Sequence, residues 1–169
     1  MRGAKHQNLW QGCVGAWCPS VDRSRSTLLT DQSVYSSHGT LTNMDAATDW
    51  VASDGKVALD FDGNQDRVSI SNSSIFSITD AITICGWVNI RQTASGQYPA
   101  LIDKNRNSQW TLLCAYSGGL NARFICNIGG VRRDLVGPLT ATGTWMFLAG
   151  TYQNGVMRIH VDNNYVEST

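Results

Sequence analysis

The sequence predicts an all-β protein built as an antiparallel β-sandwich of two sheets. From residue 55 onward, apolar residues recur at every second position, which is the period of a strand with one buried face. Turn residues interrupt these runs at short intervals. Charged helix formers are scarce, because the 169 residues include three Lys and one Glu, Glu167. Together these observations favour strands and turns over helices.

The length and charge of the chain limit its organisation and its partners. A chain of 169 residues can bury one core well but not two, so we expect a single domain over residues 1–169. Formal net charge is +0, and Arg residues are scattered apart from Arg132-Arg133. Because phosphate-backbone binding needs a basic stripe, nucleic acid is not an expected partner.

Neither a targeting signal nor a membrane segment is predicted. The first twelve residues, MRGAKHQNLWQG, hold no apolar run of seven or more, so they do not resemble a secretory signal. No stretch is long and apolar enough to span a bilayer, so we expect no membrane insertion. The cellular location stays open.

The strands are predicted in order along the chain. Residues 19–50 are rich in Ser, Thr and Asp and should form long loops with short strands. In AITICGWVNI, the inward set is Ile82, Ile84, Gly86, Val88 and Ile90, with Cys85 and Trp87 on the reverse. Further alternating runs are QWTLLCAY, ARFICNI, TWMFLAGTY and VMRIHVD. The Asn154-Gly155 pair predicts a hairpin, and the residues from Asp162 to Asn164 predict a second tight turn.

The cysteines and the large aromatic side chains are expected to be structural. We interpret Cys13, Cys18, Cys85, Cys114 and Cys126 as reduced core residues. No CxxC pair occurs and no His has ligand spacing to Cys, so a zinc site is not expected. Trp17, Trp87 and Trp145 lie within regular strands, so we expect them to be buried.

Several blocks, in this order, resemble a known family. They are CVGAWCPS, the DQSVYSSHGTLTN segment with an Asp-x-Ser turn and a His-Gly-Thr strand, ALDFDGNQDRVSI, ITICGWVNI and TWMFLAGTYQNGVMRIHVD. From Cys13 to Asp162 the chain resembles a laminin-G-like jelly roll of the concanavalin A-like type. The resemblance implies two or three further strands after the last hairpin. We therefore expect a C-terminally incomplete domain, with an open edge near residues 14–17 and 165–169 that self-association or a partner chain completes.

Catalysis is an alternative function, because glycoside hydrolases also use this fold. Their retaining mechanism needs two carboxyl groups about 5 Å apart, often on a Glu-x-Asp-x-Glu strand. The chain has one Glu, and Asp60 and Asp62, at alternate positions, are explained by a strand that leads into a turn. We therefore expect no catalysis.

A calcium site is one interpretation of the turn after residue 60. Asp62, Asn64 and Asp66 place oxygen atoms at alternate positions, but Gln65 and Ser71 stand where an EF-hand needs Gly and Glu. The resemblance to laminin-G-like domains still allows calcium held by loop oxygens. A plain strand-turn-strand is the alternative.

Aromatic residues outside regular strands are the candidates for ligand binding. The apolar face of a sugar stacks on an exposed ring, and Trp50, Tyr98 and Trp110 fall at loop or strand-end positions. The resemblance implies a non-catalytic recognition or adhesion module that binds a glycan or a surface protein. The alternative is a structural subunit, such as a decoration, cement or fibre protein of a virus or phage particle, which the lack of a secretory signal favours.

Overall fold

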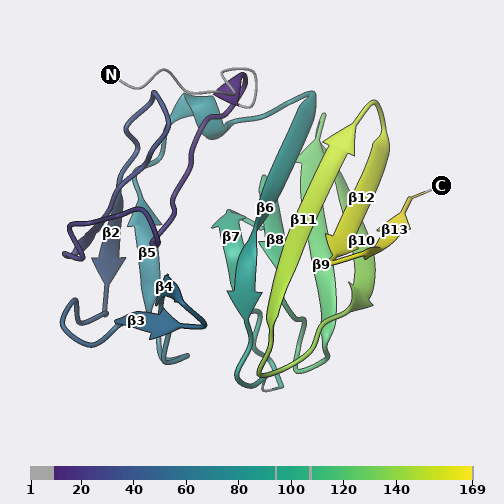
Figure 1. Ribbon diagram of the computed structural model, residues 1–169. Coiled ribbons are helices and arrows are strands. Elements are labelled where there is room, and N and C mark those ends of the chain that lie inside the picture. Colours follow the sequence, from purple (N-terminus) through teal and green to yellow (C-terminus); the bar gives the residue numbers. More distant parts are fainter. Residues whose placement is uncertain (1–9, 94, 107, 169) are drawn as a thin grey trace. The chain divides into compact units, whose positions relative to one another are not determined.

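The computed structural model describes residues 10–93, 95–106 and 108–168 (Figure 1). Its strands pair antiparallel throughout, as the sequence predicts. The chain forms two compact units, residues 1–76 and residues 77–169, and each is described by itself. The expectation of a single domain stays a prediction, and the segments 1–9 and 169 lie outside the described residues.

The first unit is loop-rich, with short strands. It contains one sheet in the order β1-β2-β5 and one hairpin, β3-β4. Its elements are β1 (Leu28–Leu29), β2 (Gly39–Thr42), β3 (Trp50–Ser53), β4 (Lys56–Leu59), β5 (Arg67–Ile70) and a 3₁₀ helix (Ser74–Phe76). The prediction of long loops with short strands over residues 19–50 is confirmed.

Buried carboxylates organise these loops. Asp31 is 4% exposed and its two oxygens accept hydrogen bonds from the backbone N–H groups of Ala16, Ser33 and Ser37 and from the Ser33 hydroxyl. The His38 Nδ1 atom accepts a hydrogen bond from the Asp31 backbone N–H. The Asp-x-Ser turn predicted from the sequence therefore joins two loop segments, because the Asp31 carboxylate bonds to the backbone at residues 16 and 37.

A second buried carboxylate makes the first unit sensitive to acid. Burial by itself raises the pKa of Asp22, but hydrogen bonds from Ser24 and Thr30 outweigh it and lower the pKa from 3.8 to about 2. Since the unfolded carboxyl titrates near 3.9, this stabilisation is complete above about pH 4 and is lost as the pH falls toward 2.

We expect Asp22→Asn to flatten this pH dependence. At about 1.4 kcal/mol per pKa unit, the carboxylate contributes roughly 2 kcal/mol at neutral pH. Urea unfolding between pH 6 and 2.5, followed for the wild type and for the variant, measures the effect. Equal loss of stability by both proteins between pH 4 and 2.5 would contradict it.

The second unit is a two-layer sandwich (Figure 1). One layer has the strand order β13-β12-β11-β6 and the other β10-β9-β8-β7. The strands are β6 (Ala81–Asn89), β7 (Ala100–Lys104), β8 (Trp110–Leu113), β9 (Asn121–Ile128), β10 (Val131–Leu139), β11 (Trp145–Gln153), β12 (Val156–Val161) and β13 (Asn164–Glu167). The predicted antiparallel two-sheet sandwich is confirmed.

The core of this unit lies between the two layers. Phe124 on β9 is fully buried and faces Gly150 on β11, where a Cβ atom would lie 2.8 Å from the ring. The Cys126 Sγ and Met157 Sδ atoms are 4.0 Å apart across the same interface. The close approach of the Phe124 ring to β11 requires a residue without a side chain at position 150.

Two predicted turns are confirmed by the backbone. Asn154 and Gly155 join β11 to β12 with φ angles of 50° and 85°, the left-handed values that a two-residue hairpin needs. Asp162 takes a φ of 51° between β12 and β13. Short polar side chains tolerate this conformation, which explains why turn prediction succeeded here.

The predicted faces of β6 are right, whereas the predicted burial of its tryptophan is wrong. Ile82, Ile84 and Ile90 are buried, as expected for the inward set. Trp87 is 57% exposed, because it points to the outer face of the layer. Trp145 shares that outer face and is only half-buried.

The cysteines divide between core and surface. All five are reduced, with Cys114 and Cys126 buried, Cys13 half-buried, and Cys18 and Cys85 exposed. The interpretation of Cys18 and Cys85 as core residues is therefore wrong. Cys18 lies in a loop, and Cys85 lies on the outer face of β6, which the opposite layer of the sandwich does not cover.

This division predicts selective alkylation. Burial raises the pKa of Cys114 to about 12. Burial also raises the pKa of Cys126, to about 11, although the positive charge of Arg133 opposes part of this increase. Because the thiolate is the nucleophile, iodoacetamide at pH 7.5 should label Cys18 and Cys85 in the native protein and leave Cys114 and Cys126 unlabelled. Peptide mass spectrometry before and after denaturation measures this, and native labelling of Cys126 would contradict it.

Candidate functional site

A cluster of tyrosine and arginine side chains occupies the outer face of the β10-β9-β8-β7 layer. We call it the tyrosine–arginine cluster and define it as Tyr98, Arg106, Tyr116, Arg123 and Asp134. Inner-face residues of β9 alternate with Arg123, so strand alternation directs Arg123 outward. Asp134 on β10 pairs with Ile125, which is two residues from Arg123 and therefore on the same face of β9.

Backbone hydrogen bonds place the two tyrosines side by side. The Cys114 N–H donates to the Pro99 carbonyl at 2.8 Å, and the Ser117 N–H donates to the Gln97 carbonyl at 2.9 Å, so the β7-β8 ladder continues past both strands. A tight turn follows, with Ser117 and Gly118 at φ angles of 50° and 84°. Tyr98 and Tyr116 meet edge to face, with ring centroids 4.9 Å apart.

Each tyrosine ring carries a guanidinium group on its face. The Cζ atom of Arg106 lies 4.3 Å from the Tyr98 centroid, and that of Arg123 lies 3.7 Å from the Tyr116 centroid. These are cation–π distances, and stacking leaves the N–H groups at the guanidinium edges oriented. The arrangement places hydrogen-bond donors over two aromatic rings.

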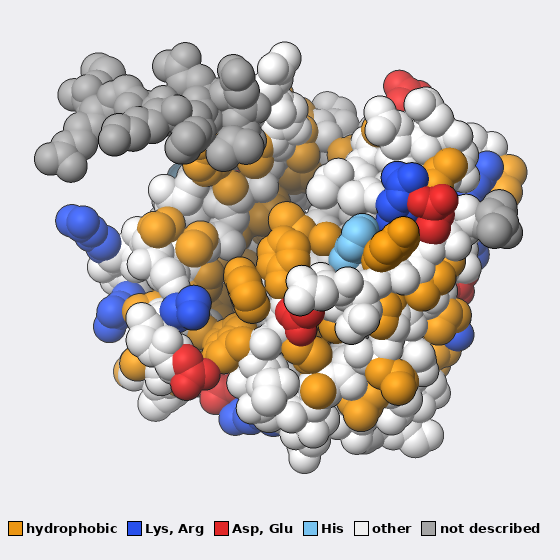
Figure 2. Space-filling view, turned by 45° about the vertical axis from the view of Figure 1, so that its right-hand side comes forward, with side chains coloured by type: hydrophobic (Ala, Val, Ile, Leu, Met, Phe, Trp, Pro, Cys, Tyr) orange, Lys and Arg blue, Asp and Glu red, His pale blue; other side chains and the backbone are white. Residues whose placement is uncertain are grey.

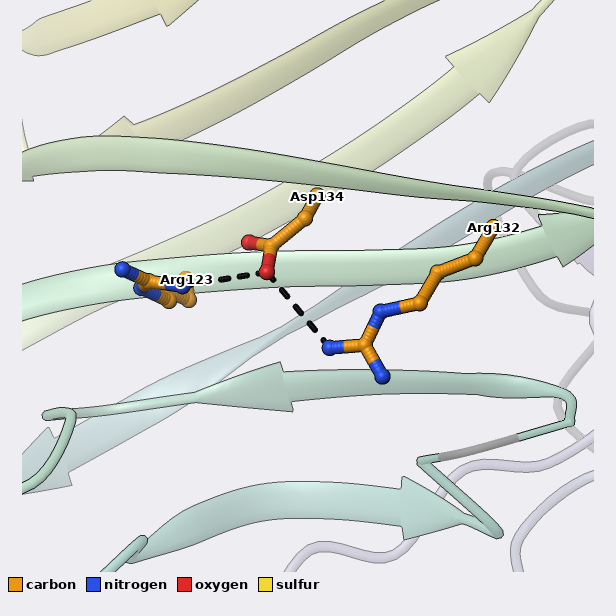
Figure 3. A network of polar contacts seen from close by, with 3 residues as sticks. All are labelled: Arg123, Arg132 and Asp134. Atoms are coloured by element: carbon orange, nitrogen blue, oxygen red, sulfur yellow. Dashed lines mark hydrogen bonds and ion pairs between the residues drawn. The ribbon is translucent and has the colours of Figure 1, made fainter.

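The Asp134 carboxylate forms ion pairs with two of the arginine side chains on this face. The Asp134 Oδ2 atom lies 3.0 Å from Arg123 Nη1 and 3.5 Å from Arg132 Nη2, and Figure 3 shows the carboxylate between the two guanidinium groups. The Nε atom of Arg123 is buried without a hydrogen-bond partner. Tyr98 is 37% exposed, so part of the cluster is open to solvent.

One further acid lies on the same outer face. Asp103 pairs with Thr111 in the row that runs through Ile125 to Asp134. Burial raises the pKa of Asp103, and the backbone N–H and charge of Arg106 oppose the increase. The face therefore combines three arginines with two carboxylates.

The three predicted ligand-binding aromatics are not brought together. Tyr98 belongs to the tyrosine–arginine cluster. Trp50 begins β3 in the first unit, is half-buried and donates its indole N–H to the Ser26 carbonyl at 2.9 Å. Trp110 begins β8 but is 6% exposed and pairs with Cys126 on the inner face, so the expectation of an exposed ring there is wrong.

The predicted calcium ligands share one turn, where they bond to the turn itself. The Asp66 Oδ2 atom accepts the Asp62 N–H at 2.9 Å, and the Asp62 Oδ1 atom accepts the Asn64 N–H at 2.6 Å. Over the described part of the chain, no three His, Cys, Asp or Glu side chains are placed to hold a metal ion. These three side chains alone do not supply the six to eight oxygens that calcium takes, so backbone carbonyls or waters would have to complete a site, and calcium binding here stays a prediction.

Sequence reasoning missed most of the tyrosine–arginine cluster. Arg123 and Asp134 stand on the polar side of alternating strands, which could mark them as outward-facing. Their proximity to Tyr116 depends on the register of β8, β9 and β10, which no local pattern gives.

Comparison with known proteins identifies the fold family. The laminin G family model described as the concanavalin A-like lectin/glucanases superfamily matches residues 62–169. The chain belongs to this family. No curated protein and no solved structure matches it significantly. Among the described residues of this laminin-G-like chain, no helix is long and apolar enough to cross a bilayer.

Proposed function

We propose that this laminin-G-like protein is a non-catalytic recognition module that binds a glycan or a protein on a surface through the tyrosine–arginine cluster. One observation carries the proposal: Tyr98 and Tyr116 meet edge to face while a guanidinium group stacks on each ring. Tyr and Arg are the residue types that dominate binding energy at recognition surfaces, because they combine apolar area with oriented donors.

The distribution of acidic residues supports a role without catalysis. The single Glu, Glu167, forms an ion pair with Arg158 on β13 and β12. Asp103 on β7 and Asp134 on β10 have β8 and β9 between them, so they are three strand spacings of about 4.8 Å apart, too far for a carboxyl pair about 5 Å apart. A retaining glycosidase needs one carboxyl group that stays protonated beside a nucleophilic carboxylate.

The test compares Tyr98→Ala with a matched control. The wild-type protein is applied to a glycan array and to immobilised extracellular-matrix proteins, and the strongest signal is quantified by calorimetry. Tyr98→Ala should weaken that binding by about tenfold or more, as loss of an aromatic anchor does. Tyr35→Ala removes a tyrosine of similar exposure from the first unit and should leave binding unchanged.

Two results would reject the proposal. The first is full binding by both Tyr98→Ala and Arg106→Ala. The second is release of reducing ends from an array glycan by the purified protein. Calcium at Asp62, Asn64 and Asp66 stays a prediction, and Asp66→Ala in the same calorimetry series tests it.

The sheet order favours a structural subunit as a second candidate. β13 ends its layer and pairs only with β12 among the described strands, and Tyr165 on it is 60% exposed. A neighbouring chain could add a strand there through main-chain hydrogen bonds, as in an assembled particle. Light scattering of the isolated protein would then show a defined oligomer and no glycan specificity.

A further inference from the structure

Two exposed aliphatic side chains on β10 extend the outer face that carries the tyrosine–arginine cluster. We call Val136 and Leu139 the aliphatic pair, and they are 43% and 70% exposed. Val136 is the register partner of Arg123, and Leu139 is the register partner of Asn121, two residues before Arg123 on β9. Register partners share a face of the sheet, and so do residues two apart in one strand. Both aliphatic side chains therefore lie on the outer face beside Arg123.

A β-bulge places both members of the aliphatic pair on this one face. Residues 136 and 139 are three positions apart, so a regular strand would direct their side chains to opposite faces. Their partners on β9 are only two positions apart, so β10 contains one extra residue between them. The bulge therefore directs Leu139 to the side that carries the cluster.

The residues within the bulge fix its geometry. A Cβ atom at Gly137 would lie 2.8 Å from the Ile159 side chain, so glycine is required at this point. Pro138 has no backbone N–H, so the break in the ladder leaves no donor unpaired there. The Asn121 side-chain amide donates a hydrogen bond to the Gly137 carbonyl at 3.4 Å. The outward position of Leu139 is thus specified by several residues.

Exposure alone does not mark a binding site on this protein. Hydrophobic side chains are exposed over much of the surface in Figure 2, and scattered apolar residues are normal on protein surfaces. The aliphatic pair differs because a bulge re-aims one of its members and because arginine and tyrosine side chains lie next to it. Bulges are common where a strand must direct a side chain toward a functional surface.

The aliphatic pair favours a protein ligand over a glycan. A sugar packs its apolar face on a flat aromatic ring, and a branched aliphatic side chain offers no such flat surface. Aliphatic side chains instead bury apolar area against other apolar side chains. Protein-binding surfaces are enriched in Tyr and Arg around an apolar centre, and this face combines the same residue types.

The charges on this face indicate that the ligand also carries an acidic group. The three arginines described above share the face with two carboxylates, so one positive charge is in excess, although the whole chain has a formal net charge of +0. The Arg132 side chain is 42% exposed, which leaves N–H groups open to a second carboxylate. Carboxylates form charge-assisted hydrogen bonds with guanidinium groups, so an acidic ligand is complementary to this face.

The dimensions of the face fit a short extended peptide. Leu139 lies on β10 at one side, Tyr98 precedes β7 at the other, and the Arg123 guanidinium lies between them over Tyr116. Three strand spacings separate β10 from β7, which is about 14 Å. In an extended peptide, alternate side chains point the same way, and four residues cover about 13 Å. The first, third and fifth side chains of such a peptide can therefore reach Leu139, the arginines and Tyr98 in turn.

We propose that the tyrosine–arginine cluster and the aliphatic pair together bind an extended segment of a partner protein with an apolar, an acidic and an apolar side chain at alternate positions. This inference rests on the recognition function proposed above and narrows its ligand to a protein. The first apolar side chain packs on the aliphatic pair, the carboxylate bonds to the arginines, and the second apolar side chain packs on Tyr98.

A synthetic peptide array tests the proposal with the whole chain. Each peptide has Gly-Ser flanks and a five-residue core with Leu, Ile, Val, Met, Phe or Tyr at its first and fifth positions, Asp or Glu at its third, and Ser between them. Matched peptides carry Asn or Gln at the third position, or the acidic residue at the second. The wild type should bind a subset of the acidic peptides. Either change should weaken the strongest of them by about tenfold in fluorescence anisotropy.

Leu139→Ser and Val131→Ser form a matched pair of variants. Both remove an exposed aliphatic side chain from β10, but Val131, which is 56% exposed, lies at the opposite end of the strand as the partner of Ile128. Leu139→Ser should weaken the strongest peptide by about fivefold or more, because it removes one apolar contact. Val131→Ser should bind like the wild type. Since both side chains are exposed, both variants should keep the circular-dichroism melt of the wild type.

Three results would overturn the proposal. They are no binding to any acidic peptide, equal binding to acidic and amide peptides, and equal binding by Leu139→Ser and the wild type. If Tyr98→Ala abolishes binding to a glycan while Leu139→Ser does not, the recognition function stands and the peptide inference fails. If neither Tyr98→Ala nor Arg106→Ala changes any binding, both fail.

Discussion

Phe124→Ala should reduce the free energy of unfolding of the second unit by about 3 to 5 kcal/mol, the largest effect that we expect from a single truncation. The Phe124 ring is fully buried on the inner face of β9 and packs against Gly150, which has no side chain that could move into the cavity. The lost apolar burial and the unfilled cavity both contribute. Urea denaturation followed by circular dichroism measures the change.

Trp87→Ala is the matched control for this truncation. It also removes a large aromatic side chain from a long strand of the sandwich, but that side chain is 57% exposed and contacts Phe147 on the outer face. We expect it to cost about 1 kcal/mol or less, in the range of a surface aromatic pair. Equal destabilisation by both variants would mean that the two faces of the layer are wrongly assigned.

Asp31→Ala should destabilise the first unit by at least about 3 kcal/mol. The carboxylate satisfies three backbone N–H groups and one hydroxyl, and removing it leaves these donors unpaired in a buried site. These hydrogen bonds also keep the pKa of Asp31 below its ordinary value, although burial acts to raise it. Thermal and urea unfolding, monitored by tryptophan fluorescence, report the loss.

Asp62→Ala provides the comparison for Asp31. Asp62 also accepts a backbone N–H two residues ahead, but it lies on an exposed turn where water replaces the lost bond. We expect a change of about 0.5 kcal/mol or less. If Asp31→Ala were equally mild, the loops around residues 16 and 37 would not depend on this carboxylate.

The features predicted correctly are those that depend on neighbouring residues in the chain. The alternation in β6 gave Ile82, Ile84 and Ile90 as one face, because successive side chains of a strand point to opposite sides. Asn154-Gly155 gave the β11-β12 turn, because these residues tolerate a positive φ. The Asp-x-Ser pattern at Asp31 gave a turn in which the carboxylate bonds two residues ahead.

The candidate site could be predicted only in part. Tyr98 was recognised as an accessible aromatic residue, and it lies in the tyrosine–arginine cluster. Trp110, also at a strand end, turned out to be buried opposite Cys126. A position in the sequence shows where a strand begins, but not which of its faces another sheet covers.

The sequence by itself determined the strand period, the hairpin turns and the family, because backbone preferences and side-chain alternation act over a few residues. Only the tertiary structure decided which outer faces stay open and which side chains meet there. Tyr98, Tyr116 and Arg123 come together through pairing between separate strands, and so do Trp87, Phe147 and Tyr165. Strand order and register depend on contacts far apart in the chain, which no local pattern contains.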